Sequence, residues 1–458
     1  MTHRANLTTM PSIERRTFIT ASAAAGASLF LPRLPRMRPR PSAAQLRYQR
    51  AERALFLHFG INTFTDREWG DGTESPSLFN PAALDARRWA RDARSAGFRS
   101  LILTAKHHDG FCLWPSAVTA HSVASSPWRG GTGDVVREFT DACNAEGLGA
   151  GLYLSPWDRH EPSYGDSPRY NDFYIAQLTE LLTRYGPITE VWFDGANGEG
   201  PNGKRQVYDW ERIHRTVRKL QPEAVIFSDA GPDVRWIGNE KGTAGDPNWS
   251  TVNPETVPYP GVSGPDVEAM LQHGDPAGSV WRPGEADVSI RPGWFWHEAE
   301  NDKVKTADEL VDLYFKSVGR NANLLLNVPP TRDGLLHDAD VAALSAFSDK
   351  LDAILATDPG AGARIAKSSR GVTLTLPEAV QFDIVDLREA IEHGQTIARY
   401  RVDAWDNGAW QTISRGTTIG HRKLDRVAPT RTERVRVVVE EAIGPVALAG
   451  ISLWKRPV

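Results

Sequence analysis

The sequence has 458 residues, with 53 Lys and Arg against 57 Asp and Glu, a formal net charge of −4 at pH 7, 15 Trp and two Cys. This balance lacks the basic excess that nucleic-acid binding usually requires, so nucleic acid is not expected as a partner. Two Cys allow at most one disulfide and exclude both a disulfide scaffold and a Cys-rich zinc site.

The first 44 residues are predicted to be a signal peptide of the twin-arginine (Tat) type. Arg15 and Arg16 precede an apolar, Ala-rich stretch at 21–31, which is too short to span a bilayer. The small residues at 42–44 offer a cleavage site, although the Arg-rich segment at 33–40 before them is atypical of one. No other stretch approaches the roughly 18 apolar residues of a membrane helix. We therefore expect an exported protein, periplasmic or secreted, without membrane contact after cleavage.

Residues 45–357 are predicted to form an α/β domain, a TIM-like (β/α) barrel. Short apolar runs alternate with helical patterns, which is typical of βα units and a parallel sheet. The expected strands are 54–60, 100–105, 149–154, 191–193, 224–228 and 323–328. The expected helices are 85–96, 134–146, 171–185, 206–220, 306–318 and 339–356. The segment 230–300 is rich in Gly and Pro, and its pattern does not place the sixth and seventh strands.

A linker at 357–362 separates the barrel from a C-terminal domain, 361–458, predicted to be a small β-sandwich. Segments of alternating or β-branched residues predict strands at 371–376, 396–405, 409–414 and 433–440. Asp406-Asn407-Gly408 predicts a hairpin turn between two of them. Trp405, Trp410 and Trp454 are candidates for a carbohydrate-binding surface, although simple packing against the barrel is the favoured interpretation.

Polar side chains follow four successive predicted strands at their carboxyl ends. They are His58, then His107 and His108, then Tyr153 with Ser155 and Trp157, then Asp194. In a (β/α) barrel these ends form one rim, where catalytic groups lie. A lone His is often a core residue, and an isolated Asp-Gly pair also fits a turn or a helix cap, but this grouping favours a binding site. Neutral His and indole N–H groups suit sugar hydroxyls, and Glu68 and Trp69 in the first βα loop extend the set.

From about His58 to Pro330 the chain resembles the α-L-fucosidases of glycoside hydrolase family 29. The similar motifs are HFGINTF at 58–64, TAKHHDGFCLWPS at 104–116, YLSPWD at 153–158, EVWFDGA at 190–196 and SVGRNANLLLNVPP at 317–330. The resemblance implies that Asp194 is the nucleophile. It also implies that His58, His107, His108 and Tyr153 bind the hydroxyls of fucose, with Glu68 and Trp69 matched less closely.

A retaining glycosidase needs a second carboxyl group as general acid/base, about 5 to 5.5 Å from the nucleophile. The segment 230–300 offers Glu240, Glu285 and Asp287. The GNE motif at 238–240 and DVSIRPGWFWH at 287–297 resemble the 1,3/1,4-α-L-fucosidase branch of the family. In that branch the matching acid/base is Glu240, so we expect Glu240 in this role, with Glu285 as the alternative.

Further candidates for substrate contact are Trp157, Arg235, Trp294 and Trp296, each with a structural role as the other interpretation. The resemblance implies an exo-acting, retaining enzyme that removes α-1,3- or α-1,4-linked terminal L-fucose from glycans and needs neither cofactor nor metal. Three alternatives stay open. They are a broader fucosidase that accepts α-1,2 linkages and aryl fucosides, a non-catalytic fucose-binding protein, and a zinc hydrolase using the rim His residues and Asp194.

Overall fold

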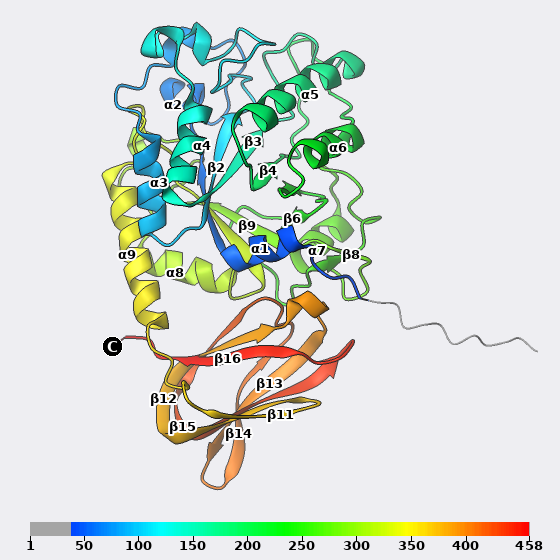
Figure 1. The fold of residues 1–458 in the computed structure, drawn as a ribbon, viewed down its shortest axis with the longest axis vertical. Helices are drawn as coiled ribbons and strands as arrows, with labels where there is room; N and C mark the ends of the chain where they lie inside the picture. The colour runs from blue at the N-terminus through cyan, green and yellow to red at the C-terminus, as the bar shows by residue number, and fades with distance from the viewer. Residues whose placement is uncertain (1–37, 458) are drawn as a thin grey trace, which may run out of the picture. The chain divides into compact units, whose positions relative to one another are not determined.

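Eight parallel strands close into a barrel (Figure 1). They are β1 (Arg53–Leu57), β2 (Ser100–Lys106), β3 (Gly149–Leu154), β4 (Glu190–Trp192), β5 (Val225–Ser228), β6 (Val234–Trp236), β9 (Gly284–Ser289) and β10 (Ala322–Asn327). Each strand pairs with the next one named here, and β10 pairs with β1. The computed structural model describes residues 38–457, so the twin-arginine motif and its apolar stretch lie outside the described residues. The predicted TIM-like barrel is confirmed.

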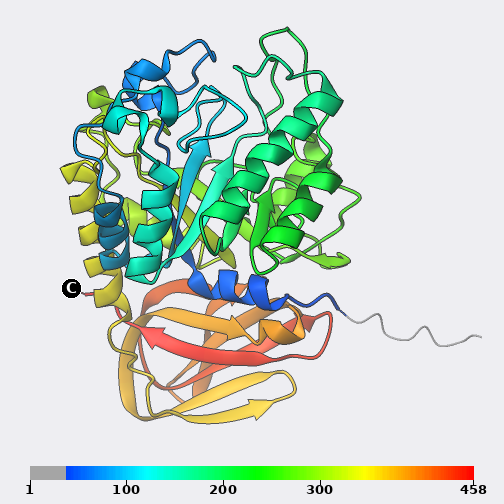
Figure 2. The same ribbon diagram turned by 45° about the horizontal axis from the view of Figure 1, so that its top comes forward.

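Helices cover the outside of the barrel (Figure 2). They are α3 (Ala86–Ser95), α4 (Val135–Glu146), α5 (Ser167–Arg184), α6 (Trp210–Leu220), α7 (Pro265–His273), α8 (Ala307–Lys316) and α9 (Asp338–Leu355). The shorter helices are α1 (Ala43–Ala51), α2 (Ile61–Thr65) and the 3-10 turns η1 (Pro76–Leu78), η2 (Val123–Ser125), η3 (Trp128–Gly131), η4 (Glu298–Glu300) and η5 (Ile391–His393). The strands alternate as a barrel requires: Val191 and Phe193 join the core under the helices, whereas Trp192 joins the barrel interior.

The segment 230–300 departs from the βα repeat, which explains why its strands escaped prediction. β6 has three residues and follows β5 after a short loop, with no helix between them. A separate two-stranded sheet of β7 (Thr251–Val252) and β8 (Val280–Trp281) then interrupts the chain before β9. Neither a long apolar run nor a crossover helix marks β6, so hydrophobic periodicity carries no signal for it.

The C-terminal domain is an antiparallel sheet with its own apolar core. Its strands are β11 (Arg364–Ser368), β12 (Gly371–Glu389), β13 (Ile397–Asp406), β14 (Ala409–Gly416), β15 (Lys423–Ala442) and β16 (Leu448–Trp454). The strand order is β11-β12-β15-β13-β14, and β16 pairs with β12. The predicted hairpin is confirmed: Trp405 pairs with Trp410, and Asn407 and Gly408 take the positive φ angles of a tight turn.

Helix α1 contains the predicted cleavage site and the predicted start of the barrel domain. Ser42 caps the helix: its side chain accepts the N–H of Gln45, and the Gln45 side chain accepts the N–H of Ser42. Gln45 also donates to the carbonyl oxygens of Asp233 and Trp281, at 2.8 Å each. Residues 42–44 are therefore part of the fold. Within residues 38–457, no helix is long and apolar enough to cross a membrane.

Candidate active site

A cavity of about 380 Å³ opens at the carboxyl ends of the barrel strands. Its walls are Phe56, His58, Glu68, Trp69, His107, His108, Tyr153, Trp192, Asp194, Ala196, Glu240, Asp287 and Trp294. The structure thus brings together nine of the side chains expected from the sequence, on segments from residue 58 to residue 294. A cavity of this size accommodates a monosaccharide.

Asp194, two residues beyond β4, is held at both carboxylate oxygens. The Tyr153 phenol donates to Asp194 Oδ2 over 3.0 Å, and His108 Nε2 lies 3.6 Å from the same oxygen. Asp194 Oδ1 accepts the N–H of Ala196 within its own turn. The Asp194 side chain is 26% exposed, so it is oriented by two donors, the Tyr153 phenol and the Ala196 N–H, and is still reachable from the cavity. This is the arrangement that a reacting carboxylate needs.

Hydrogen bonds to the rim His residues define which ring nitrogen carries the proton. Asn327 Oδ1 accepts from His58 Nδ1 over 2.8 Å. Ser155 Oγ donates to the carbonyl of Trp157 over 2.7 Å and must therefore accept from His108 Nδ1, at 2.8 Å. Both rings then present an unprotonated Nε2, which accepts a hydrogen bond. In these tautomers the Nε2 atoms of His58 and His108 are acceptors for hydroxyl hydrogens, and the expected donor role of the rim His residues stays a prediction.

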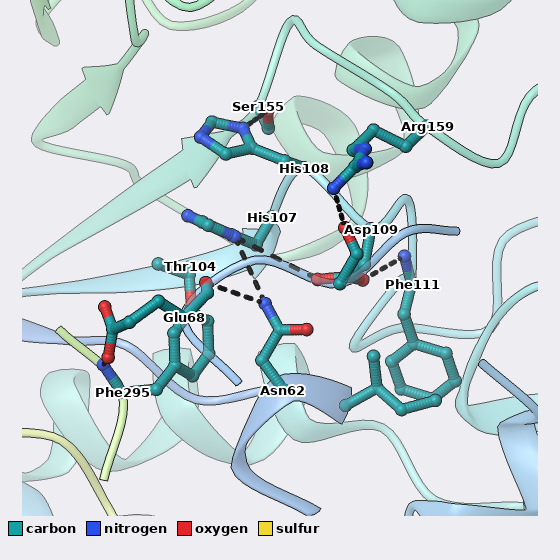
Figure 3. Close-up of polar contacts among 12 residues, drawn as sticks. Asn62, Glu68, Thr104, His107, His108, Asp109, Phe111, Ser155, Arg159 and Phe295 are labelled. Atoms are coloured by element: carbon teal, nitrogen blue, oxygen red, sulfur yellow. Dashed lines mark hydrogen bonds and ion pairs between the residues drawn. The ribbon is translucent and has the colours of Figure 1, made fainter. Parts of the chain in front are cut away.

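His107 carries its proton on the other ring nitrogen, Nε2. The Asn62 amide nitrogen contacts His107 Nδ1 at 3.4 Å, as Figure 3 shows, which leaves Nε2–H as a donor. Burial lowers the pKa of His58 to about 3 and lowers the pKa of His107 and His108 below the ordinary value. All three rings are therefore neutral at neutral pH. One donor and two acceptors match a set of hydroxyl groups, each of which both donates and accepts.

The turn after β2 keeps His107 and His108 in place (Figure 3). Asp109 Oδ1 accepts the N–H of Phe111 over 2.7 Å, and Asp109 Oδ2 lies 4.0 Å from His107 Nδ1. Burial raises the pKa of Asp109 to about 7. Asp109 is buried behind the His pair and acts as their support.

Glu240 lies at the exposed edge of the cavity, and the indole nitrogen of Trp294 donates to Glu240 Oε2 over 3.4 Å. Trp294 also faces the His58 ring, with 5.1 Å between ring centroids. Glu68 fixes the loop that carries this indole, because its carboxylate accepts the N–H groups of Trp294 and Phe295 at 2.9 and 3.1 Å. The loops after β1 and β9 are thereby joined across the cavity.

Glu285, the alternative acid/base, lies in the barrel interior and does not line the cavity. It is fully buried, and its two oxygens accept from Tyr48 Oη at 2.7 Å and Trp192 Nε1 at 2.8 Å. Asp287, two residues further along β9, does line the cavity and accepts from Trp236 Nε1 at 2.7 Å. Burial, with Glu240 and Glu285 nearby, raises the pKa of Asp287 well above its ordinary value. Asp287 is therefore a cavity wall whose surroundings favour its protonated form.

Three other candidates are not among the cavity walls, and their expected contact with substrate stays a prediction. The Arg235 guanidinium is buried and donates to the Leu271 carbonyl and to Asn248 Oδ1, so it braces the 230–300 segment. Trp296 is buried and donates to Asn301. Trp157 packs beside His108 and Trp69, which both line the cavity. Trp69 itself is 60% exposed and forms the outer rim.

Sequence reasoning missed the side chains that hold the candidates, among them Asn62, Asn327 and Asp229. Asp229 comes directly after the predicted strand at 224–228, much as Asp194 follows its own strand. Its position at a strand end was therefore a sequence signal that could have identified it. Asn62 and Asn327 stand inside motifs at 58–64 and 317–330, but nothing in the spacing shows that each contacts a His ring. Among residues 38–457, no group of three or more His, Cys, Asp or Glu side chains is arranged to hold a metal ion.

A parallel (β/α) barrel whose rim holds accessible carboxyl groups, neutral His rings and indoles around a sugar-sized cavity defines a glycoside hydrolase. The family model for alpha-L-fucosidase matches residues 44–353. The chain is 44% identical over 450 residues to alpha-L-fucosidase 1 of Arabidopsis thaliana, a match that covers 91% of this chain and 87% of the relative. The chain therefore belongs to the α-L-fucosidase family, glycoside hydrolase family 29, and is an α-L-fucosidase.

Solved structures agree with this assignment. A glycoside hydrolase 29 family member from an unknown rumen bacterium has a TM-score of 0.87 and 39% identity, covering 93% of this chain and 78% of that chain. A fucosidase from Ruminococcus gnavus in complex with fucose has a TM-score of 0.83 and 33% identity, covering 92% of this chain and 95% of that chain. Both likenesses extend through the barrel and the C-terminal sheet.

Proposed function

We propose that the enzyme is a retaining exo-α-L-fucosidase with Asp194 as nucleophile and Glu240 as general acid/base. The observation that carries this proposal is the position of the two carboxyl groups in one cavity, Asp194 on a strand end and Glu240 on an exposed loop. Asp194 attacks the anomeric carbon while Glu240 gives a proton to the leaving oxygen. Glu240 then takes a proton from water, which cleaves the fucosyl ester of Asp194 and returns fucose in its original configuration.

Proton NMR of the first product tests the stereochemistry. An aryl α-L-fucoside is hydrolysed in deuterated buffer, and the anomeric signals are followed before mutarotation equilibrates them. Initial appearance of α-L-fucose supports the double displacement. Initial appearance of β-L-fucose contradicts it and indicates a single displacement by water.

We further propose that the enzyme prefers α-1,3- and α-1,4-linked fucose on branched glycans. Support comes from the segments 238–240 and 287–297, which supply Glu240 and Trp294 to the open side of the cavity. Fucose release is measured from a Lewis-type trisaccharide, 2′-fucosyllactose and an aryl fucoside. Release mainly from the Lewis sugar supports the preference, whereas comparable release from all three assigns the broader specificity.

We also propose that the protein is exported and that cleavage leaves Ser42 on the mature chain. Ser42 and Gln45 form the reciprocal cap of α1, and removal of such a cap costs a helix about 1 kcal/mol. N-terminal sequencing of the exported protein checks both points. A mature terminus at or before Ser42 agrees with the proposal, and a terminus at Gln45 contradicts the placement of the cleavage site.

A further inference from the structure

Asp229 is a half-buried carboxyl group next to the reacting centre that the mechanism above does not use. It directly follows β5, the neighbour of β4, and so stands beside the turn that carries Asp194. Its Oδ2 accepts the N–H of Gly261 over 3.1 Å. Asp229 is absent from the cavity walls, so it lies behind the Asp194 turn rather than facing a substrate.

Gly195 is packed directly against Asp229 and Gly261. A Cβ atom on Gly195 would lie 2.0 Å from Asp229 Oδ2 and 2.8 Å from the Gly261 nitrogen. Gly261 has a φ of +82°, and a Cβ on it would lie 2.5 Å from the Gly195 carbonyl oxygen. The ends of β4 and β5 and the 259–264 loop therefore meet with no space for a side chain at either Gly.

This contact bears on the orientation of Asp194, because Asp194 Oδ1 accepts the N–H of Ala196. Gly195 is the residue between them, so a shift of Gly195 moves the donor that fixes the carboxylate. We propose that Asp229 is a positioning residue: together with Gly261 it holds Gly195, and through Gly195 it holds Asp194 in its attacking geometry. The inference rests on the proposed role of Asp194 as nucleophile.

The charge state of Asp229 agrees with this role. Burial and the neighbouring Asp194 carboxylate raise the pKa of Asp229 to about 7, while the Gly261 N–H opposes the rise. Below about pH 7 Asp229 is thus neutral and does not repel Asp194. Its packing against Gly195, rather than its charge, is what the nucleophile turn requires.

Kinetics of Asp229 variants on an aryl fucoside test the proposal. Asp229→Ala removes the contact with Gly195 and Gly261, and we expect kcat to fall by about 10- to 100-fold with KM within about threefold. Asp229→Asn keeps the shape and an oxygen for the Gly261 N–H, so it should retain at least about a third of wild-type kcat. Asp229→Ser is a milder truncation, and its kcat should lie between those of Asp229→Ala and Asp229→Asn. It provides the comparison if the Ala variant does not fold.

Gly195→Ala provides an independent test, because its new Cβ would collide with Asp229 Oδ2. We expect a loss of kcat at least as large as that of Asp229→Ala, and a smaller loss for Gly195→Ala when Asp229 is already Ala, since the collision is then relieved. Equal kcat in wild type and Asp229→Ala, or fully additive losses, overturns the inference. If Asp194→Asn also retains wild-type activity, the proposed nucleophile fails as well, so the two failures are distinguishable.

Discussion

The barrel carries two pairs of carboxyl groups, one at its rim and one in its interior, and they differ in what surrounds them. Asp194 and Glu240 line the rim cavity and have oxygens accessible to a ligand. Glu190 and Glu285 lie at the amino-terminal level of β4 and β9, and both are at least 97% buried. Tyr48 and Trp192 already satisfy the Glu285 oxygens. The accessible pair is able to react, whereas the buried pair does not face the rim cavity.

Cavity volume alone does not identify which end of the barrel is catalytic. A cavity of about 790 Å³ lies at the amino-terminal mouth, where Glu190, Tyr48 and the first residues of α1 form part of its wall. That cavity is larger than the one at the rim, but its carboxyl groups do not form an accessible pair: Glu190 is buried, Glu223 is exposed and pairs with Arg47, and Glu285 is sealed behind Tyr48. The pairing of accessible groups, rather than volume, identifies the catalytic end.

The largest effect is expected at the rim. Asp194→Asn removes the attacking oxygen and keeps the shape of the side chain, so kcat/KM for an aryl fucoside should fall by about 10⁴-fold or more. The melting temperature should stay within a few degrees of wild type, because the side chain is partly exposed. Steady-state kinetics and thermal melting check this, and a variant with more than about a tenth of wild-type activity would contradict the assignment.

Substitution in the interior pair, Glu190 and Glu285, should change the stability of the fold more than the activity. Glu285→Gln keeps one acceptor oxygen and replaces the other with an N–H donor, which leaves Tyr48 or Trp192 without its partner. We expect a loss of about 1–3 kcal/mol in unfolding free energy. Because Trp192 lines the rim cavity, kcat should also fall, but by less than about tenfold. Chemical denaturation and kinetics on one preparation separate the two effects, and Glu223→Gln at an exposed position serves as the control.

The pH dependence of stability distinguishes the interior pair further. Burial and the Glu285 carboxylate raise the pKa of Glu190 well above its ordinary value, so folded Glu190 holds a proton that the unfolded chain releases above about pH 4.3. The free energy of unfolding therefore decreases as pH rises above that value. Glu190→Gln removes this dependence, and its melting temperature relative to wild type should increase from pH 5 to pH 8. A constant difference across this range would show that Glu190 is ionised in the fold.

The smallest effect is expected in the C-terminal sheet. The rings of Trp405 and Trp410 lie 4.8 and 5.1 Å from the Arg434 guanidinium, and Arg436 lies 4.4 Å from the Trp410 ring. These indole faces are occupied, which argues against a carbohydrate-binding surface. Trp410→Ala should change kcat/KM by less than about twofold on both an aryl fucoside and a branched glycan. A selective loss on the glycan would restore the binding-module interpretation.

Trp454 illustrates the structural role of the same domain. It packs against the barrel core, and its indole nitrogen donates to Asp386 over 3.3 Å. Asp386 in turn accepts from Arg422, which also contacts Glu52 beside β1. These buried ion pairs join the sheet to the barrel, in agreement with the interpretation favoured from the sequence.

Much of the fold and several rim residues followed from the sequence, because strand alternation and the strand-end position of polar residues are local patterns. The preference for Glu240 over Glu285 came only from the resemblance to the 1,3/1,4-α-L-fucosidase branch, because depth along the barrel axis is not a local pattern. Glu285 pairs in register with Trp236 and Asn323, which places it low in the barrel, and neither the sheet register nor β6 was visible in the sequence. The bracing contacts of Arg235 were not visible for the same reason, because its position in β6 directs it towards the Leu271 carbonyl.

The most direct test of the central claim is chemical rescue by azide. Glu240→Ala and Glu285→Ala are each assayed on an activated aryl α-L-fucoside with and without azide. Azide enters the space left by a missing acid/base and attacks the fucosyl-enzyme, so Glu240→Ala should regain turnover and form α-L-fucosyl azide. Glu285→Ala should show no azide-dependent product. Formation of fucosyl azide by Glu285→Ala, with no response from Glu240→Ala, would contradict the assignment of the rim pair as the catalytic pair.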